Sequence, residues 1–147
     1  AALERPTADK PRRDPMYHPK QQAFDARLKK MFDEVDSYIE DSYGSAYTLH
    51  PARPERGATE NPQADGLFNI GADFTAGYGS QRGRGYLIDV TMATLDDVDE
   101  DVRREIYEAT AAKVKELLPI HFPERRLDVY RDGNHFKIQG NFSLGKI

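Results

Sequence analysis

Two aspartates have the strongest claim to chemistry in this sequence. Asp73 and Asp89 lie in two segments whose apolar and polar residues alternate, the pattern of half-buried β-strands. If Ala76 pairs with Tyr86 across a hairpin, Asp73 faces Asp89, and two facing carboxylates repel unless they share a proton or a cation. Such a pair could serve acid–base catalysis or hold a hard metal ion. A register shifted by two residues would instead leave two separate, solvated carboxylates.

Histidine adds one further catalytic candidate. His135 is expected on an open sheet face, where it could join Asp89 if the strand order allows. No histidine has the spacing of a metal ligand, cysteine is absent, and no serine lies in a Gly-x-Ser-x-Gly sequence. The acidic run at 97–101 has the spacing of a calcium loop, but Val102 stands where that loop needs glycine, so a capped helix start explains it better. We therefore predict no metal site and no cofactor.

The glycine-rich segment 77–85 is the candidate for binding an anion. Glycine lets backbone amides curl toward a negative group, and Arg82 and Arg84 could clamp a phosphate or carboxylate between them. Ser80 and Gln81 complete this predicted site. The segment lacks the Gly-Lys-Ser/Thr of a P-loop and joins a strand to a strand, unlike a dinucleotide-binding motif. A solvated hairpin tip is the alternative interpretation.

Composition places the 147 residues in one ordinary globular domain. No apolar run approaches the roughly 18 residues needed to cross a bilayer, so we expect no membrane span. The net charge of −4 disfavours bulk binding of nucleic acid. The chain begins Ala-Ala-Leu without Met and has no cysteine, which leaves the compartment open between the cytoplasm, which we favour, and export of a processed precursor.

Proline divides the chain into an arm, a domain and a long loop. Residues 1–19 contain four prolines among charged residues, so we predict an extended arm. A single domain follows over residues 20–147. Within it, residues 44–65 hold three prolines and no periodicity, and a loop of this length is usually functional or bound to a partner.

Hydrophobic periodicity predicts the elements of the domain. Apolar residues spaced by three and four predict helices over 20–43 and 98–118, the second of which Pro119 should end. Alternation predicts strands, in two hairpins, at 67–78, 86–95, 126–131 and 134–142.

The second hairpin should turn at Asp132-Gly133, a strong two-residue turn signal that pairs Val129 with Phe136. The order α-β-β-α-β-β predicts an α+β fold: a four-stranded, largely antiparallel sheet with two helices packed on one face. The other face should be polar and open.

Three functions from different classes fit these features. We favour a non-catalytic interaction or assembly module that self-associates or docks in a larger complex through its arm, long loop and open sheet face. The first alternative is a small enzyme that uses Asp73 and Asp89, with His135. The second is a binder of anions or nucleic acid through Arg82 and Arg84. The expected partner is a protein or a second copy of the chain, with nucleic acid less favoured.

Overall fold

The computed structural model describes residues 19–77 and 83–140. Residues 1–18 of the predicted arm and three members of the predicted anion site, Ser80, Gln81 and Arg82, lie outside these ranges, whereas Pro19, the last residue of the predicted arm, begins a helix.

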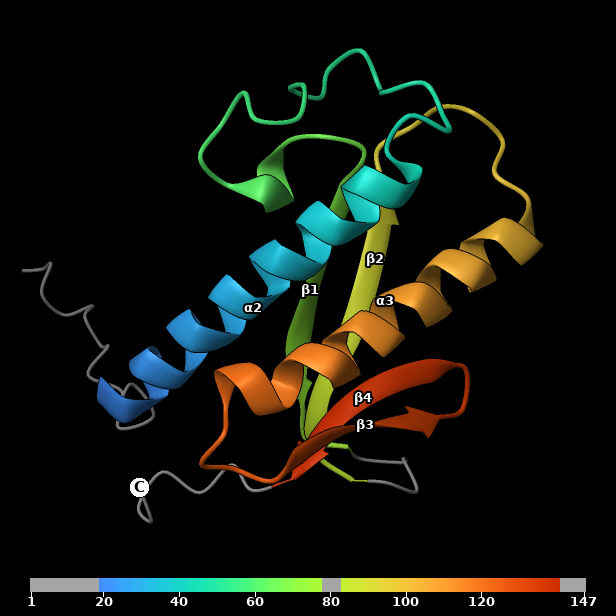
Figure 1. The fold of residues 1–147 in the computed structure, drawn as a ribbon. Helices are drawn as coiled ribbons and strands as arrows, with labels where there is room; N and C mark the ends of the chain where they lie inside the picture. Colours follow the sequence, from blue (N-terminus) through green and yellow to red (C-terminus); the bar gives the residue numbers. More distant parts are fainter. Residues whose placement is uncertain (1–18, 78–82, 141–147) are drawn as a thin grey trace, which may run out of the picture.

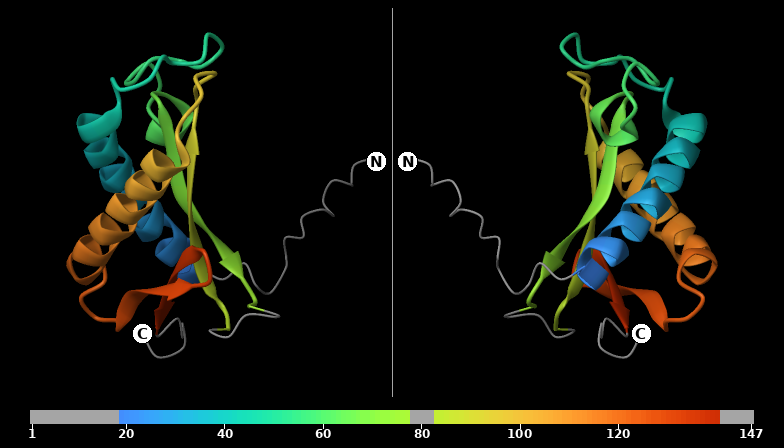
Figure 2. Two further views of the ribbon diagram at one scale, coloured as in Figure 1. Left: turned by 90° about the vertical axis from the view of Figure 1, so that its right-hand side faces the viewer. Right: turned by 90° about the vertical axis from the view of Figure 1, so that its left-hand side faces the viewer.

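Two helices and a four-stranded antiparallel sheet form the described domain (Figure 1). The elements are α2 (Pro19–Tyr43), the short 3-10 helix η3 (Pro62–Ala64), β1 (Phe68–Thr75), β2 (Gly85–Met92), α3 (Glu100–His121), β3 (Leu127–Asp132) and β4 (His135–Gly140). The strands are ordered β1-β2-β4-β3, and all neighbours are antiparallel. Both helices cover the same face of the sheet (Figure 2). The predicted α+β fold and element order are confirmed.

Helix α2 forms because its apolar residues recur at helical spacing between two helix-ending residues. Pro19 occupies the first position, and Gly44 follows the last turn, where its N–H donates to the carbonyl oxygen of Glu40 at 2.8 Å. The buried stripe consists of Phe24, Leu28, Met31, Phe32, Val35 and Ile39. The predicted bounds therefore agree with the structure to one residue.

Helix α3 continues past the residue that was predicted to end it. Pro119 lies inside the last turn, and the N–H of Phe122 donates to the carbonyl oxygen of Leu118 at 2.8 Å. A proline removes one helical hydrogen bond, and so near the end of a helix that loss disturbs little that follows. The prediction that Pro119 ends the helix was wrong, because the helix ends at His121, three residues beyond the predicted last residue, 118.

The register between β1 and β2 differs from the predicted one by two residues. Phe74 lies opposite Tyr86, and Asp73 lies opposite Leu87, so Asp73 does not face Asp89. The reason lies at the end of β1. Gly77 has a φ of +81° and approaches Gly83 so closely that an added Cβ would overlap the Gly83 backbone. Gly77 and Gly83 lie two positions beyond the last pair, Thr75 with Gly85, in this same register, and a shift by two keeps every side chain on its predicted face.

The β3–β4 turn is displaced by one residue from its predicted place. Asp132 pairs with His135, so the two central residues are Gly133 and Asn134. Gly133 has a φ of +65°, which suits glycine at the first position of a type II′ turn. The predicted pairing of Val129 with Phe136 was therefore wrong, since Val129 faces Ile138.

A single core lies between the sheet and the helices. Phe68, Ile70, Ile88 and Ile138 from the sheet pack with the stripes of α2 and α3. No helix among the described residues is long and apolar enough to cross a membrane.

Candidate functional site

Strands β2 and β4 pair over a very short distance and then part. Tyr86 faces Ile138 and Leu87 faces Lys137, and the next pair in this register would be Ile88 with Phe136. At this position the hydroxyl of Tyr107, from α3, bridges the two strands in place of a direct backbone hydrogen bond between Phe136 and Ile88. It donates to the carbonyl oxygen of Ile88 at 2.9 Å and accepts from the N–H of Phe136 at 2.8 Å. One helix side chain thus separates two strands that would otherwise continue as a ladder.

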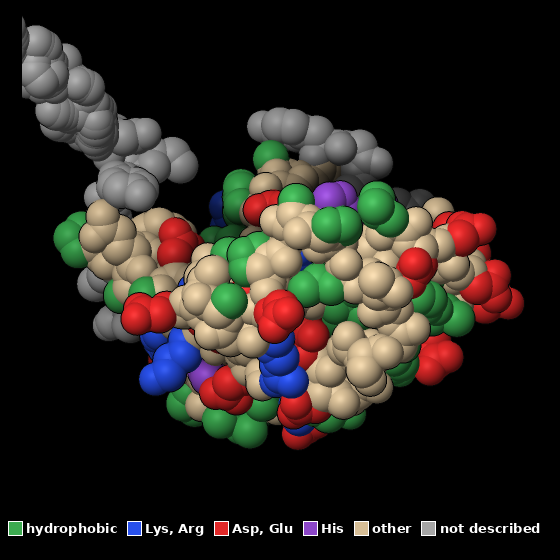
Figure 3. All heavy atoms as spheres, turned by 90° about the horizontal axis from the view of Figure 1, so that it is seen from above, with side chains coloured by type: hydrophobic (Ala, Val, Ile, Leu, Met, Phe, Trp, Pro, Cys, Tyr) green, Lys and Arg blue, Asp and Glu red, His purple; other side chains and the backbone are tan. Residues whose placement is uncertain are grey.

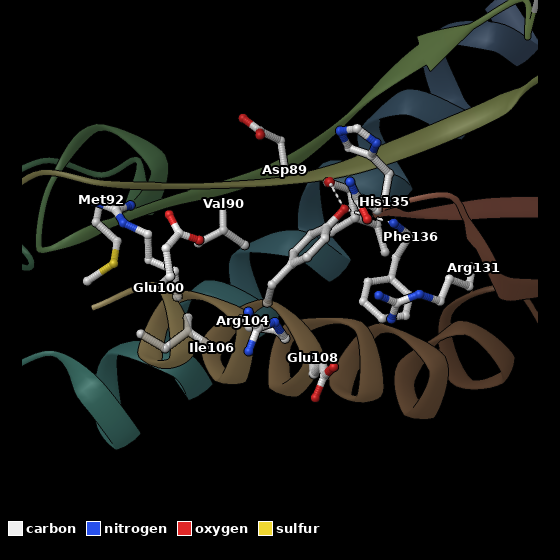
Figure 4. A pocket seen from close by; sticks show the side chains of 14 residues that line it. Asp89, Val90, Met92, Glu100, Arg104, Ile106, Glu108, Arg131, His135 and Phe136 are labelled. Atoms are coloured by element: carbon white, nitrogen blue, oxygen red, sulfur yellow. Dashed lines mark hydrogen bonds between the residues drawn. The ribbon is translucent and has the colours of Figure 1, made fainter. Parts of the chain in front are cut away.

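A cavity of about 480 Å³ opens where these strands part, and we call it the β2–β4 cavity (Figure 4). Its apolar lining comes from β2, α3 and β4: Ile88, Val90, Met92, Ile106 and Phe136. Its charged lining comes mainly from the first half of α3 and from the β3–β4 hairpin: Glu100, Arg103, Arg104, Glu108 and Arg131. A volume of this order suits a small ligand or a few residues of peptide.

The cavity brings together two of the three predicted catalytic residues. Asp89, on β2, and His135, on β4, both line it and are both exposed, and their side chains lie on the side of β2 that faces away from α3 (Figure 4). Asp73 is also exposed, but it is not among the lining residues and lies opposite Leu87. Asp73 and Asp89 are therefore not opposite each other, whereas Asp89 and His135 line the same cavity.

Tyr107 is the residue of the candidate site that the sequence did not reveal. Burial raises the pKa of its hydroxyl; the N–H of Phe136 opposes that rise, and the charge of Asp89 adds to it. The hydroxyl stays protonated at neutral pH, as its donation to Ile88 requires. The sequence did contain one signal for Tyr107, since it lies beside the predicted buried stripe of a helix. A buried tyrosine hydroxyl needs a polar partner, so such a position indicates a hydrogen bond to another element.

The charges around the cavity have both signs, with an excess of acid at one end. The guanidinium of Arg104 bonds to the Asp101 carboxylate at 2.8 Å, and that of Arg131 lies 5.1 Å from the ring centre of Phe136. Seen from above, acidic side chains gather at the end of the molecule where α3 begins (Figure 3). The exposed acids of this stretch are Asp96, Asp97, Asp99, Glu100 and Asp101.

Little of the predicted anion site can be placed. Arg84 is exposed, and its carbonyl oxygen accepts from Gln139 Nε2 at 2.9 Å. No group of three or more histidine or acidic side chains in the described ranges could hold a metal ion.

A second cluster of charge lies at the outer edge of β1 and is built from buried acids. Glu40 Oε2 accepts from the N–H of Phe68 at 2.8 Å, and Asp36 accepts from the N–H of Ile70. Burial, and then the charge of Glu40, raise the pKa of Asp36 to about 8. Burial likewise raises the pKa of Glu40. One carboxylate oxygen of Asp36, Oδ2, has no hydrogen-bond partner among the described residues.

The long loop supplies the other half of this cluster. The guanidinium of Arg53 donates to four backbone carbonyl oxygens, one of which is that of Phe68 at 3.0 Å. Gln63 Nε2 donates to the carbonyl oxygen of Ile70 at 2.8 Å. Side chains therefore bind the N–H and the C=O of both Phe68 and Ile70. These bonds hold residues 44–65 in place, and we assign the cluster a structural role.

Two glycines leave the space that Glu40 needs. A Cβ added at Gly66, where φ is +74°, would lie 2.5 Å from Glu40 Oε2. A Cβ added at Gly44 would lie 2.6 Å from Glu40 Oε1.

The family model that matches this chain covers residues 19–140 and carries the description "Uncharacterised protein". The chain belongs to this family. The match runs from the first residue of α2 to the last residue of β4, so the family shares the whole described domain. A relative from Borreliella burgdorferi, described as "Uncharacterized protein", is 42% identical over 109 residues, which are 74% of this chain and 85% of that protein. No solved structure matches the chain.

Proposed function

We propose that the domain is a non-catalytic interaction module that binds a protein partner at the β2–β4 cavity and the adjoining open face of the sheet. The observation that carries this proposal is the parting of β2 from β4 after Leu87 and Lys137. Beyond that point the outer edge of β2 has no neighbouring strand within the described ranges. An unpaired strand edge offers a row of backbone donors and acceptors to another chain.

The face of the sheet opposite the helices lies beside this edge and is accessible to a partner in solution. Asn69, Asp73, Asp89 and Thr91 are exposed on the side of β1 and β2 opposite the helices. Their side chains are short and polar, and a non-obligate interface is, as a whole, about as polar as the rest of the protein surface, with a polar rim. The long loop, which we expected to take part in docking, has an internal role at β1, so we place the binding surface at β2. Docking by the arm stays a prediction.

A small enzyme is the second candidate, because Asp89 and His135 line the same cavity as the Tyr107 hydroxyl. That hydroxyl is already engaged, as it donates to Ile88 and accepts from Phe136. Proton transfer to a substrate would break the bonds that hold the strand ends apart. This competition favours binding over catalysis.

Site-specific photo-crosslinking in cells of the source organism tests the proposal. A photoreactive amino acid would replace Arg104, which is exposed at the cavity, and in a matched variant Ile120, which is exposed near the other end of the same helix. We expect a single adduct of defined mass from position 104, either with another protein or with a second copy of the chain, and none from position 120. Equal adducts from both positions, or none from position 104, would contradict the proposal. Light scattering of the purified chain separates self-association from a different partner.

A further inference from the structure

Beyond Leu87, alternate backbone groups of β2 face the cavity, and those after Ile88 have no backbone partner among the described residues. Successive residues of a strand direct their N–H and C=O to opposite sides. The carbonyl oxygen of Ile88 points away from β1, toward Tyr107. Val90 and Met92 share this orientation, because they follow Ile88 at intervals of two. Their N–H and C=O groups therefore face the cavity, which both residues line.

The side chains around this edge differ between its two faces. Toward α3, the lining includes the apolar side chains of Val90 and Ile106 together with charged side chains of the helix, whereas Asp89 projects from the opposite side of the strand (Figure 4). Asp89 makes no ion pair with any basic residue of the described ranges. The acidic start of α3 lies at the same end of the molecule, where Glu100 reaches the cavity.

We infer that the β2–β4 cavity takes an extended peptide segment, antiparallel to β2, in which apolar side chains alternate with lysine or arginine. The peptide backbone pairs with Val90 and Met92, its apolar side chains fill the space against Ile106, and a basic side chain stands beside Asp89. Opposite charges on neighbouring strands stabilise a sheet, and alternation is the period of a strand. This inference rests on the proposed function and adds the chemistry of the partner.

Synthetic peptides test the inference directly on the full-length chain. The probe has about five residues, the length of β2 between Ile88 and Met92, with valine alternating with lysine. We expect millimolar binding that shifts the amide NMR signals of Val90 and Met92 and slows their hydrogen exchange. A peptide with glutamate in place of lysine should bind more weakly.

Backbone methylation shows whether main-chain pairing carries the binding. In the antiparallel arrangement the valine amides of the peptide point toward β2 and the lysine amides point away. An N-methyl group on the central valine should abolish binding, whereas one on a lysine should be tolerated. Equal affinity of the two methylated peptides would overturn the inference, because side chains alone would then account for binding.

Charge reversal tests the role of Asp89. Asp89→Asn should weaken binding of the lysine peptide about two- to fivefold, and Asp89→Lys should make the glutamate peptide the better ligand. The matched control is Asp73→Lys, an exposed strand aspartate one strand farther from the cavity, which should leave the preference unchanged. An unchanged preference in Asp89→Lys, or no binding of any peptide at millimolar concentration, would overturn the inference. Crosslinking from position 104 would still succeed in that event if the proposed function holds with another kind of partner.

Discussion

The two outer edges of the β1–β2 hairpin differ in how their backbone groups are hydrogen-bonded. At the edge of β1, four side chains from α2 and the long loop bind the backbone groups of Phe68 and Ile70. At the edge of β2, a single tyrosine hydroxyl binds Ile88, and a cavity follows. A sheet edge can thus be closed by side chains without another strand. Along Val90 and Met92 no side chain of the described residues binds the backbone in this way, and there we propose that the edge accepts a partner.

The side chains that close the edge of β1 include buried acids, which destabilise the folded protein when they are charged; the edge of β2 has no such acids among the described residues. Closing the edge of β1 places Asp36 and Glu40 in the interior, where the charged form of a carboxyl group is disfavoured. The gain is a strand edge that cannot pair with another molecule and aggregate. The contrast therefore separates a structural edge from the edge at which we propose binding, and three substitutions test it.

The largest effect is expected from opening the closed edge. Arg53→Ala removes a donor to four backbone carbonyl oxygens and releases the long loop, so we expect a loss of about 3–5 kcal/mol in the free energy of unfolding. Urea denaturation measures it. The control is Arg56→Ala, which removes an exposed ion pair to Asp41 from the same loop and should cost less than about 1 kcal/mol. Similar losses in both variants would show that Arg53 does not hold the edge.

A smaller effect, with a pH signature, is expected at Asp36. Its pKa of about 8 in the folded protein lies above the ordinary value of 3.8, so the folded state holds the proton more tightly than the unfolded chain. Its contribution to stability is complete below about pH 3.8 and is lost as the pH rises to about 8.

Asp36→Asn cannot ionise and should therefore lack this dependence. We expect it to be more stable than the parent protein at pH 8.5 by on the order of 2 kcal/mol, with the advantage shrinking toward pH 4. Thermal denaturation across this pH range measures the difference. A constant difference at all pH values would mean that Asp36 does not titrate in this window.

The smallest effect is expected at the open edge. Tyr107→Phe leaves the carbonyl oxygen of Ile88 and the N–H of Phe136 without their shared partner, which should cost about 1–2 kcal/mol. Hydrogen exchange at Phe136 should accelerate more than at other β4 amides. The control is Tyr43→Phe, since the Tyr43 hydroxyl donates to Glu105 at an exposed position. If Phe136 keeps its protection in Tyr107→Phe, the hydroxyl does not hold the strand ends.

The helices and the sheet faces could be predicted from the sequence because each follows from a local period. The stripe from Phe24 to Ile39 repeats within one helix, and Pro19 and Gly44 mark its ends. The registers could not be predicted, since a shift of two residues preserves both faces. We attribute the register of β1 and β2 to the close approach of Gly77 and Gly83, which no hydrophobic periodicity in the sequence indicates.

The candidate site was only partly visible for a similar reason. Asp89 and His135 were recognised by residue type, but their shared cavity depends on the order β1-β2-β4-β3. Tyr107 acts on two strands that come from either side of α3 in the sequence. Arg53 lies in a loop without periodicity and reaches carbonyl oxygens up to 15 residues away. Contacts of this kind follow from the folded geometry and leave no local signal.

The close packing around Glu40 restricts which substitutions the family can accept at positions 40, 44 and 66. The Glu40 carboxylate occupies the space that side chains at positions 44 and 66 would need. The same carboxylate accepts a hydrogen bond from the N–H of Phe68. Exchange at any one of these three positions is therefore conditional on the other two. Across lineages, the acid and its two glycines should be inherited or lost as a unit, although they are up to 26 positions apart in the chain.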